Sequence, residues 1–88
     1  ALADVSFRLA PLTHADAEEM IDEVRSARLL SGLRGAAPAD RAALADAVVR
    51  VGRLAADHPE IAELDINPLL VLSAGEGVLA VDARIILE

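Results

Sequence analysis

The chain has 88 residues and a formal net charge of −7, and 55% of its residues are hydrophobic, although Phe7 is the only aromatic. This length allows one small domain with a modest aliphatic core. The acidic balance argues against sequence-independent nucleic-acid binding, which needs a basic surface to displace phosphate counterions. Because cysteine is absent, disulfide staples, thiolate nucleophiles and sulfur-ligated metals are excluded.

Neither a membrane span nor a signal peptide is evident. The longest apolar runs, such as INPLLVL, are far shorter than the roughly 20 residues that cross a bilayer. The opening stretch ALADVSFRLAPL lacks the basic and apolar regions of a signal peptide. The chain also lacks an initiating Met, and we expect residues 1–88 to be a single soluble, cytoplasmic domain excised from a longer protein.

A strand and a helix are predicted first along the chain. Residues 5–9 alternate between apolar and polar side chains, which is typical of a half-buried strand. Thr13 precedes Asp16 in an S/T-x-x-D/E pattern that marks a helix start. The helical spacing of apolar residues continues until Gly32, which is expected to end the helix. The apolar positions are Ala17, Met20, Ile21, Val24, Ala27 and Leu30.

A connector and a second helix follow. Residues 31–38 contain two glycines and a proline, and the stretch ADRAALADAVVRVGRLAAD that begins at residue 39 again has helical spacing. Gly52 lies inside this helix at a cost of about 1 kcal/mol relative to Ala. We expect it to permit close packing against a neighbouring helix or sheet. Pro59 ends the helix.

Two runs rich in Ile, Val and Leu complete the chain, at residues 61–72 and 78–87. The segment SAGEG joins them and suits the connector of a hairpin. The expected order is strand, helix, helix, strand, strand. This order predicts an α+β fold in which two helices cover one face of a small antiparallel sheet.

The polar residues of this hairpin predict its register. Opposed residues in an antiparallel hairpin share a face and their numbers have a constant sum. A sum near 149, with residues 73–76 as the turn, places Asn67 opposite Asp82 and Asp65 opposite Arg84. A slip by one residue would bury Asp82 in the apolar face, although Pro68 implies a sheet edge or a bulge that could move the register. The expected core face comprises Leu64, Ile66, Leu70, Leu79, Ala83, Ile85 and Leu87.

These polar residues allow two interpretations. The amide of Asn67 and the carboxylate of Asp82, with Asp65 and Glu63 on the same face, form a cluster of hard oxygens suited to Mg²⁺ or Mn²⁺. Such a pair would bind a metal–nucleotide complex better than the metal alone, because Mg²⁺ takes few protein carboxylates. Alternatively, Asn-Pro is a common turn dipeptide, and cross-strand Asp–Arg pairs often only solubilise an exposed face.

The segments PEIAELDINPLLV and GVLAVDARIIL resemble the end of the ATP-grasp domain in nucleoside-diphosphate-forming acyl-CoA synthetases. This family includes ADP-forming acetyl-CoA synthetase and is related to the succinyl-CoA synthetase β subunit. The stretch FRLAPLTHADAEEMIDEVRSARLLSGLRGAAPADRAAL is also similar, so the resemblance covers nearly the whole chain. It implies a C-terminal ATP-grasp subdomain in which Asn67 and Asp82 hold Mg²⁺ against the phosphates of ATP or ADP. It also implies a supporting or second-metal role for Asp65, and contact of Arg84 with a phosphate or with Asp65.

The resemblance implies partners as well. The remaining ATP-grasp lobe and the CoA-binding domains would lie elsewhere in a parent acid–CoA ligase, and this chain alone is expected to be inactive. A parent with a fused acetyltransferase domain is an alternative. A different class of function is an autonomous α+β module that binds a partner or oligomerises without catalysis. We expect His14 and His58 to be surface residues rather than phosphoryl carriers, and we expect no membrane partner.

Overall fold

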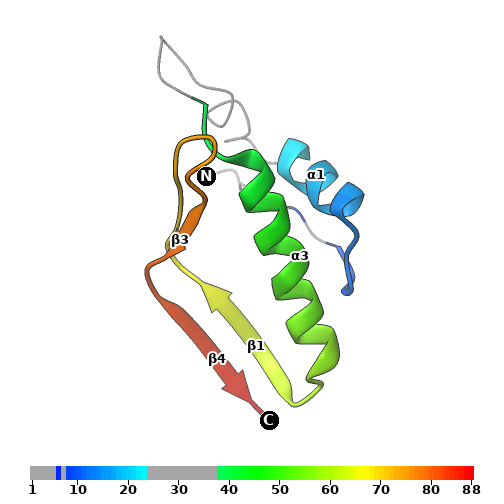
Figure 1. The fold of residues 1–88 in the computed structure, drawn as a ribbon. Coiled ribbons are helices and arrows are strands. Elements are labelled where there is room, and N and C mark those ends of the chain that lie inside the picture. Colours follow the sequence, from blue (N-terminus) through cyan, green and yellow to red (C-terminus); the bar gives the residue numbers. More distant parts are fainter. Residues whose placement is uncertain (1–5, 7, 24–37) are drawn as a thin grey trace, which may run out of the picture.

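The computed structural model describes residues 6, 8–23 and 38–88 of the chain (Figure 1). Within these residues, two helices precede a long antiparallel hairpin, so the predicted α+β class is confirmed. The helices are α1 (His14–Glu23) and α3 (Arg41–Asp57). The strands are β1 (Ile61–Ile66), β2 (Leu69–Val71), β3 (Val78–Ala80) and β4 (Ala83–Leu87).

Part of the prediction falls on residues that the structure does not describe. Residues 5 and 7 of the predicted first strand are among these, and residues 6, 8 and 9 are described but are not in a strand. The first helix is described as far as Glu23. Its predicted continuation to Gly32 and most of the connector after it lie in the undescribed range 24–37.

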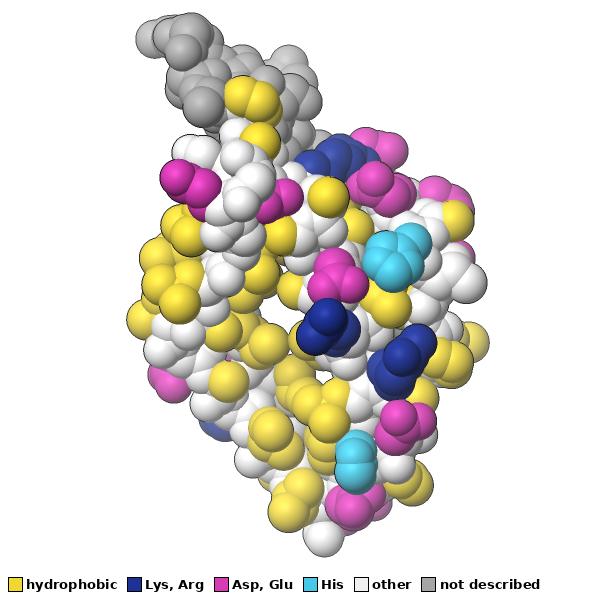
Figure 2. Space-filling view, in the orientation of Figure 1, with side chains coloured by type: hydrophobic (Ala, Val, Ile, Leu, Met, Phe, Trp, Pro, Cys, Tyr) yellow, Lys and Arg dark blue, Asp and Glu magenta, His cyan; other side chains and the backbone are white. Residues whose placement is uncertain are grey.

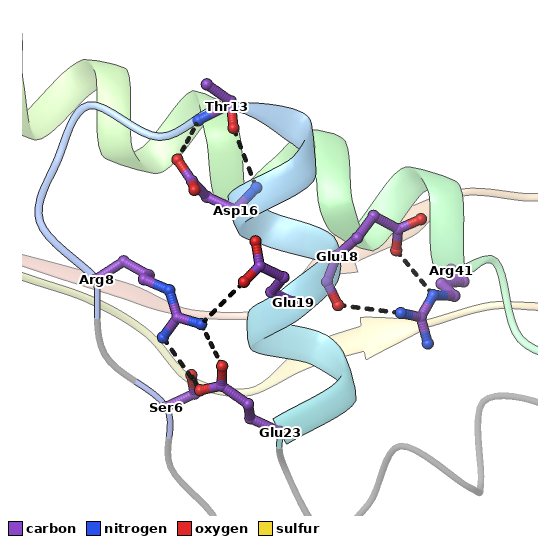
Figure 3. Close-up of polar contacts among 8 residues, drawn as sticks. All are labelled: Ser6, Arg8, Thr13, Asp16, Glu18, Glu19, Glu23 and Arg41. Carbon is purple, nitrogen blue, oxygen red and sulfur yellow. Dashed lines mark hydrogen bonds and ion pairs between the residues drawn. The ribbon is translucent and has the colours of Figure 1, made fainter.

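Helix α1 begins at the predicted position because a capping box closes its first turn. The backbone N–H of Thr13 donates to Asp16 Oδ2 at 3.0 Å, and the backbone N–H of Asp16 donates to Thr13 Oγ1 at 3.0 Å (Figure 3). The N–H of Ala17 donates to the Thr13 carbonyl, also at 3.0 Å. The bonds from the Thr13 backbone and hydroxyl hold the pKa of Asp16 below its ordinary value.

The buried core lies between the two helices, because α1 packs against α3 (Figure 1). Arg41, the first residue of α3, connects them further at the surface. Its Nε donates to Glu18 Oε1 and its Nη2 to Asp22 Oδ1, each at 2.8 Å. The buried hydrophobic residues within the described part are Ala17, Ile21, Ala45 and Val49.

A second arginine attaches the segment before α1 to the C-terminal end of that helix. Arg8 Nη1 donates to Glu23 Oε1 at 3.0 Å, and Arg8 Nη2 pairs with Glu23 Oε2 (Figure 3). The hydroxyl of Ser6 donates to the same carboxylate at 2.7 Å. The Arg8 bonds, followed by the Ser6 bond, lower the pKa of Glu23 to about 2.

Gly52 permits close packing as predicted, although the predicted neighbour, a helix or the sheet, was wrong. It is buried in α3, and a Cβ at this position would lie 3.3 Å from Leu12 Cγ. The neighbour is therefore a side chain of the segment that leads into α1, rather than another helix or the sheet. This contact fixes the distance between that segment and the middle of α3.

The hairpin has the predicted register. β1 pairs with β4 and β2 pairs with β3, both antiparallel, and the partner numbers sum to 149 from residue 63 to residue 71, as in Asp65 with Arg84. The single shift in these ladders lies between Ile61 and Glu63. Pro68 lies in the interruption between β1 and β2 and does not change the register.

The predicted apolar face is only partly right. Leu64 and Ile66 are half-buried as expected, but in β2 the half-buried residues are Leu69 and Val71, whereas Leu70 is 44% exposed. The alternation changes phase at Asn67 and Pro68, which lie between β1 and β2 and belong to neither strand. α3 contacts β2 and β3, and β4 lies on the side of β1 that faces away from α3 (Figure 1). The remaining residues assigned to the core face are exposed: Leu79, Ala83, Ile85 and Leu87.

The contact at Gly52 gives a stability prediction. Gly52→Val is expected to lower the free energy of unfolding by about 1–3 kcal/mol, because its side chain would overlap Leu12. Gly52→Ala is the matched control. The alanine methyl group makes a tight contact with Leu12, but alanine favours the helix over glycine by about 1 kcal/mol. The free energy of unfolding of this variant should therefore stay close to that of the wild type. Urea unfolding of the protein measures both, and wild-type stability in the valine variant would contradict the packing.

The pKa of Glu23 gives a pH prediction. A carboxyl group with a lowered pKa stabilises the fold above its unfolded-state pKa of about 4.5, and this contribution is lost as the pH falls towards about 2. The Glu23 carboxyl should therefore titrate near pH 2 by ¹³C NMR. Arg8→Gln should move the midpoint towards 4.5, whereas Arg50→Gln on α3 should leave it unchanged. A wild-type midpoint near 4.5 would contradict the pairing.

Candidate functional site

Asn67 and Asp82 lie opposite each other at the two interruptions of the hairpin. The backbone N–H of Asn67 donates to the carbonyl of Asp82 at 3.0 Å, and both residues are exposed. Their numbers also satisfy the sum of 149 that the flanking ladders show. The predicted pairing is confirmed, and the role of the two side chains as metal ligands stays a prediction.

The side chains of this pair are available to a ligand. Asp82 Oδ1 accepts a bond from the backbone N–H of Ala83 at 2.9 Å, which orients the carboxylate. Within the described ranges, the other Asp82 oxygen and the Asn67 amide have no hydrogen-bond partner. The backbone bond therefore holds the two residues opposite each other, and each has a side-chain oxygen without a partner among the described residues.

Asp65 and Arg84 are also cross-strand partners, as predicted. However, Arg84 Nη2 lies 3.5 Å from Glu63 Oε2, so the ion pair that the structure shows joins Arg84 to Glu63 and not to Asp65. Residues two apart on one strand share a face, and a long side chain reaches such a diagonal neighbour as easily as the residue directly opposite. Both charged groups are exposed, and such pairs contribute only about 0–1 kcal/mol. Arg84 can therefore leave Glu63 for an anion at little cost.

The number of donors limits which metal fits this site. No three Asp, Glu or His side chains come together as a metal-binding group in the part of the chain that the structure describes. If Asn67 and Asp82 bind a metal, they supply two protein ligands, which is too few for a structural zinc site or a protein-enclosed calcium site. It suits Mg²⁺, which keeps several waters and takes its other ligands from phosphates.

An apolar cavity of about 310 Å³ separates the middle of the hairpin from the helices. Figure 2 shows the molecule hollowed at this place. Residues of α1, α3, β1 and β2 line it, and its charged lining residues are Arg8 and Asp65. Asp65 therefore borders the cavity, two positions before Asn67 in the sequence. The sequence pattern did not predict this space, because alternation in a strand shows which residues turn inward and not how closely they pack.

A further carboxylate, which the sequence pattern did not predict to contact the hairpin, is that of Asp40. Asp40 caps α3 by accepting from the N–H of Ala43 at 3.1 Å, and it also accepts from the N–H groups of Gly75 and Gly77. An Asp directly before a helical pattern is a signal for an N-cap. The contacts with the two glycines carry no local signal, because they join residues 35 and 37 positions apart.

The two histidines are exposed, as expected. His14 Nε2 lies 3.6 Å from Asp46 Oδ1, and His58 Nδ1 lies 3.9 Å from Glu60 Oε2. Among the described residues, no hydrogen bond or ion pair joins either histidine to Asn67 or Asp82. No helix within the described residues is long and apolar enough to cross a membrane.

Comparisons with known proteins agree with the resemblance found in the sequence. The sequence profile of the ATP-grasp domain matches residues 1–87. Over 86 residues the chain is 51% identical to ADP-forming acetate–CoA ligase I of Archaeoglobus fulgidus and, likewise over 86 residues, 51% identical to the β subunit of ADP-forming acetate–CoA ligase I of Pyrococcus furiosus. These matches cover 98% of this chain but only 12% and 36% of the two relatives.

A solved structure shows the same fold. This is the dinucleotide-forming acetyl-coenzyme A synthetase 1 of Ca. Korarchaeum cryptofilum in complex with coenzyme A and Mg-AMPPCP. It matches with a TM-score of 0.91 and 50% identity, over 97% of this chain and 39% of that chain. The profile match, the sequence identities and the shared fold all lead to one assignment. The chain belongs to the ATP-grasp domain family.

Proposed function

We propose that this chain is one domain of a longer acyl-CoA synthetase of the ADP-forming class, called the parent protein below, and that it holds Mg²⁺ against the phosphates of a nucleotide. The observation that carries this proposal is the backbone pairing of Asn67 with Asp82, which brings an amide and a carboxylate residue opposite each other at the surface. The relatives support it, because this chain spans only 12% and 36% of their lengths.

Asn67 and Asp82 are the proposed metal ligands. Mg²⁺ neutralises developing charge and orients phosphate oxygens during phosphoryl transfer. The Asp82 carboxylate is preoriented by the N–H of Ala83, and the Asn67 amide adds a neutral oxygen without further negative charge. Two protein ligands leave the remaining octahedral positions to water and phosphate.

Asp65 and Arg84 are proposed to assist the same nucleotide. Arg84 is two residues beyond Asp82 and exchanges its exposed pairing with Glu63 for a phosphate oxygen, which a guanidinium binds well. Asp65 is two residues before Asn67 and supports the metal or its water ligands. The remaining ATP-grasp lobe and the CoA-binding domains of the parent supply the other contacts, and this domain has no turnover alone. In this proposal the parent acts in the cytoplasm.

The alternative function, an autonomous module that binds a partner, is favoured by one observation. The outward side chains of β2, β3 and the residue after β3 leave an apolar surface, with Leu70, Leu79 and Val81 exposed by 44%, 53% and 57%. In the proposed function the rest of the parent covers this surface. Reading the gene beyond both ends distinguishes the two, because the proposal requires the other ATP-grasp lobe in the same protein or in a partner subunit. If the same gene also encodes an acetyltransferase domain, the parent is an acetyltransferase-linked relative.

The metal ligands are tested by substitution in the parent protein. Asn67→Ala and Asp82→Ala are each expected to lower nucleotide-dependent turnover on the order of 100-fold or more, because Mg²⁺ loses a ligand where phosphate charge develops. Stability should change by less than about 0.5 kcal/mol, since both side chains are exposed. Asp57→Ala, an exposed carboxylate at the end of α3, is the control with normal turnover expected. Normal turnover in both ligand variants would refute the assignment.

Arg84 is tested by a separate change. Arg84→Gln in the parent is expected to raise KM for the nucleotide about tenfold, because a charge-assisted bond to phosphate is lost. Arg53→Gln on α3 is the matched control and should leave KM unchanged. If KM is unaffected in Arg84→Gln as well, the side chain only balances Glu63.

A further inference from the structure

The carboxylate of Asp40 joins α3 to the tip of the hairpin. Oδ1 accepts from the N–H of Ala43 at 3.1 Å and so caps α3. Oδ2 accepts from the N–H groups of Gly75 at 3.1 Å and Gly77 at 2.7 Å, both in the turn between β2 and β3. These three donors, with the Ala43 bond the strongest influence, hold the pKa of Asp40 below its ordinary value.

The backbone around Asp40 adds to this junction. Its N–H donates to the carbonyl of Leu72 at 2.7 Å, and the N–H of Ala74 donates to the carbonyl of Pro38 at 3.0 Å. The turn can direct two N–H groups at one carboxylate oxygen because Gly75 and Gly77 have φ values of 86° and 87°, which residues with a side chain rarely adopt. The tip of the hairpin is therefore built around the Asp40 carboxylate.

This junction attaches the tip of the hairpin to the start of α3, and the opposite end of the hairpin is attached to the end of α3. At the other end of α3, the short link to β1 holds the strands covalently, and the N–H of Ile61 donates to the carbonyl of His58 at 2.9 Å. Between the two ends lies the cavity of about 310 Å³ (Figure 2). Around the middle of the hairpin, Leu64 and Ile66 are half-buried and line this cavity, whereas Asn67 and Asp82 are exposed. The strands that carry the pair therefore border a cavity rather than a fully packed core.

We propose that Asp40 is a positioning residue for the Asn67–Asp82 pair. By fixing the tip of the hairpin to the start of α3, it sets the placement of the two strands that carry the pair across the cavity. Asp82 lies five positions beyond Gly77, about 17 Å of extended chain, so a loose tip displaces the site without any contact of Asp40 with the ligand. This role rests on the proposed function. It adds Asp40 as a residue that acts on the Asn67–Asp82 pair through the hairpin.

Asp40→Asn separates the positioning role from helix capping. Asn caps a helix about as well as Asp, so α3 should be retained, but its side chain has one acceptor oxygen in place of two and cannot also bind both glycine N–H groups. Asp46→Asn is the matched control. It makes the same chemical change on the same helix, where the carboxylate pairs only with the exposed Arg50 and His14.

The experiment combines two readouts on the parent protein. Hydrogen–deuterium exchange of the segment 73–82 is expected to rise about tenfold in Asp40→Asn, with exchange in α3 unchanged. KM for the Mg²⁺–nucleotide complex is expected to rise about tenfold while kcat stays within about twofold, because a displaced site binds more weakly. A loss of folded protein alone would lower apparent kcat and leave KM unchanged. Asp46→Asn should match wild type in both readouts.

Each result decides between the positioning role and its failure. Raised exchange with raised KM supports the role. Unchanged exchange, or raised exchange with wild-type KM, overturns it while the proposed function stands. A wild-type parent without Mg²⁺–nucleotide-dependent turnover overturns the proposed function, and the positioning role with it.

Discussion

The antiparallel register of the hairpin is the constraint on which the candidate site depends. A constant sum of 149 runs through both ladders, from the Glu63–Ile86 pair to the turn that begins at Ser73. It brings Asn67 and Asp82 together although 15 positions separate them, and it also places Asp65 beside Arg84. A shift of one residue would turn the carboxylates of one strand to the opposite face and leave no oxygen pair. Backbone hydrogen bonds therefore determine the chemistry that this surface can perform.

The rest of the fold serves to hold this hairpin. The buried core between α1 and α3 consists of small and medium aliphatic residues, and it is supplemented by Arg8 and Arg41, which tie carboxylates of α1 to the preceding segment and to α3. The hairpin itself contributes little to that core, since Leu70, Leu79 and Ile85 remain about half exposed. The helices therefore supply most of the core and the hairpin supplies an exposed surface. This distribution fits the proposal that the sheet contacts other parts of a parent protein, of which this chain would be a small share, as it is of its relatives.

Local and periodic features were predictable from the sequence, and long-range ones were not. The capping box at Thr13, the start of α3, the close approach at Gly52 and the register each leave a pattern in neighbouring or alternating residues. The phase change between Ile66 and Leu69 left none, because alternation was extended through Pro68 as if the strand were continuous. The ion pair between Arg84 and Glu63, the cavity and the contacts of Asp40 with the turn depend on packing between distant segments. The resemblance to acyl-CoA synthetases supplied an occupant for the site, which the residue pattern alone left open.

The central claim is that the paired side chains of Asn67 and Asp82 bind the metal of a metal–nucleotide complex. A crystal structure of the parent protein with Mg²⁺ and a non-hydrolysable nucleotide tests it most directly. The account predicts Mg²⁺ at about 2.1 Å from one oxygen of each side chain, with phosphate oxygens and water completing an octahedron. A nucleotide-bound Mg²⁺ that contacts neither side chain would contradict it.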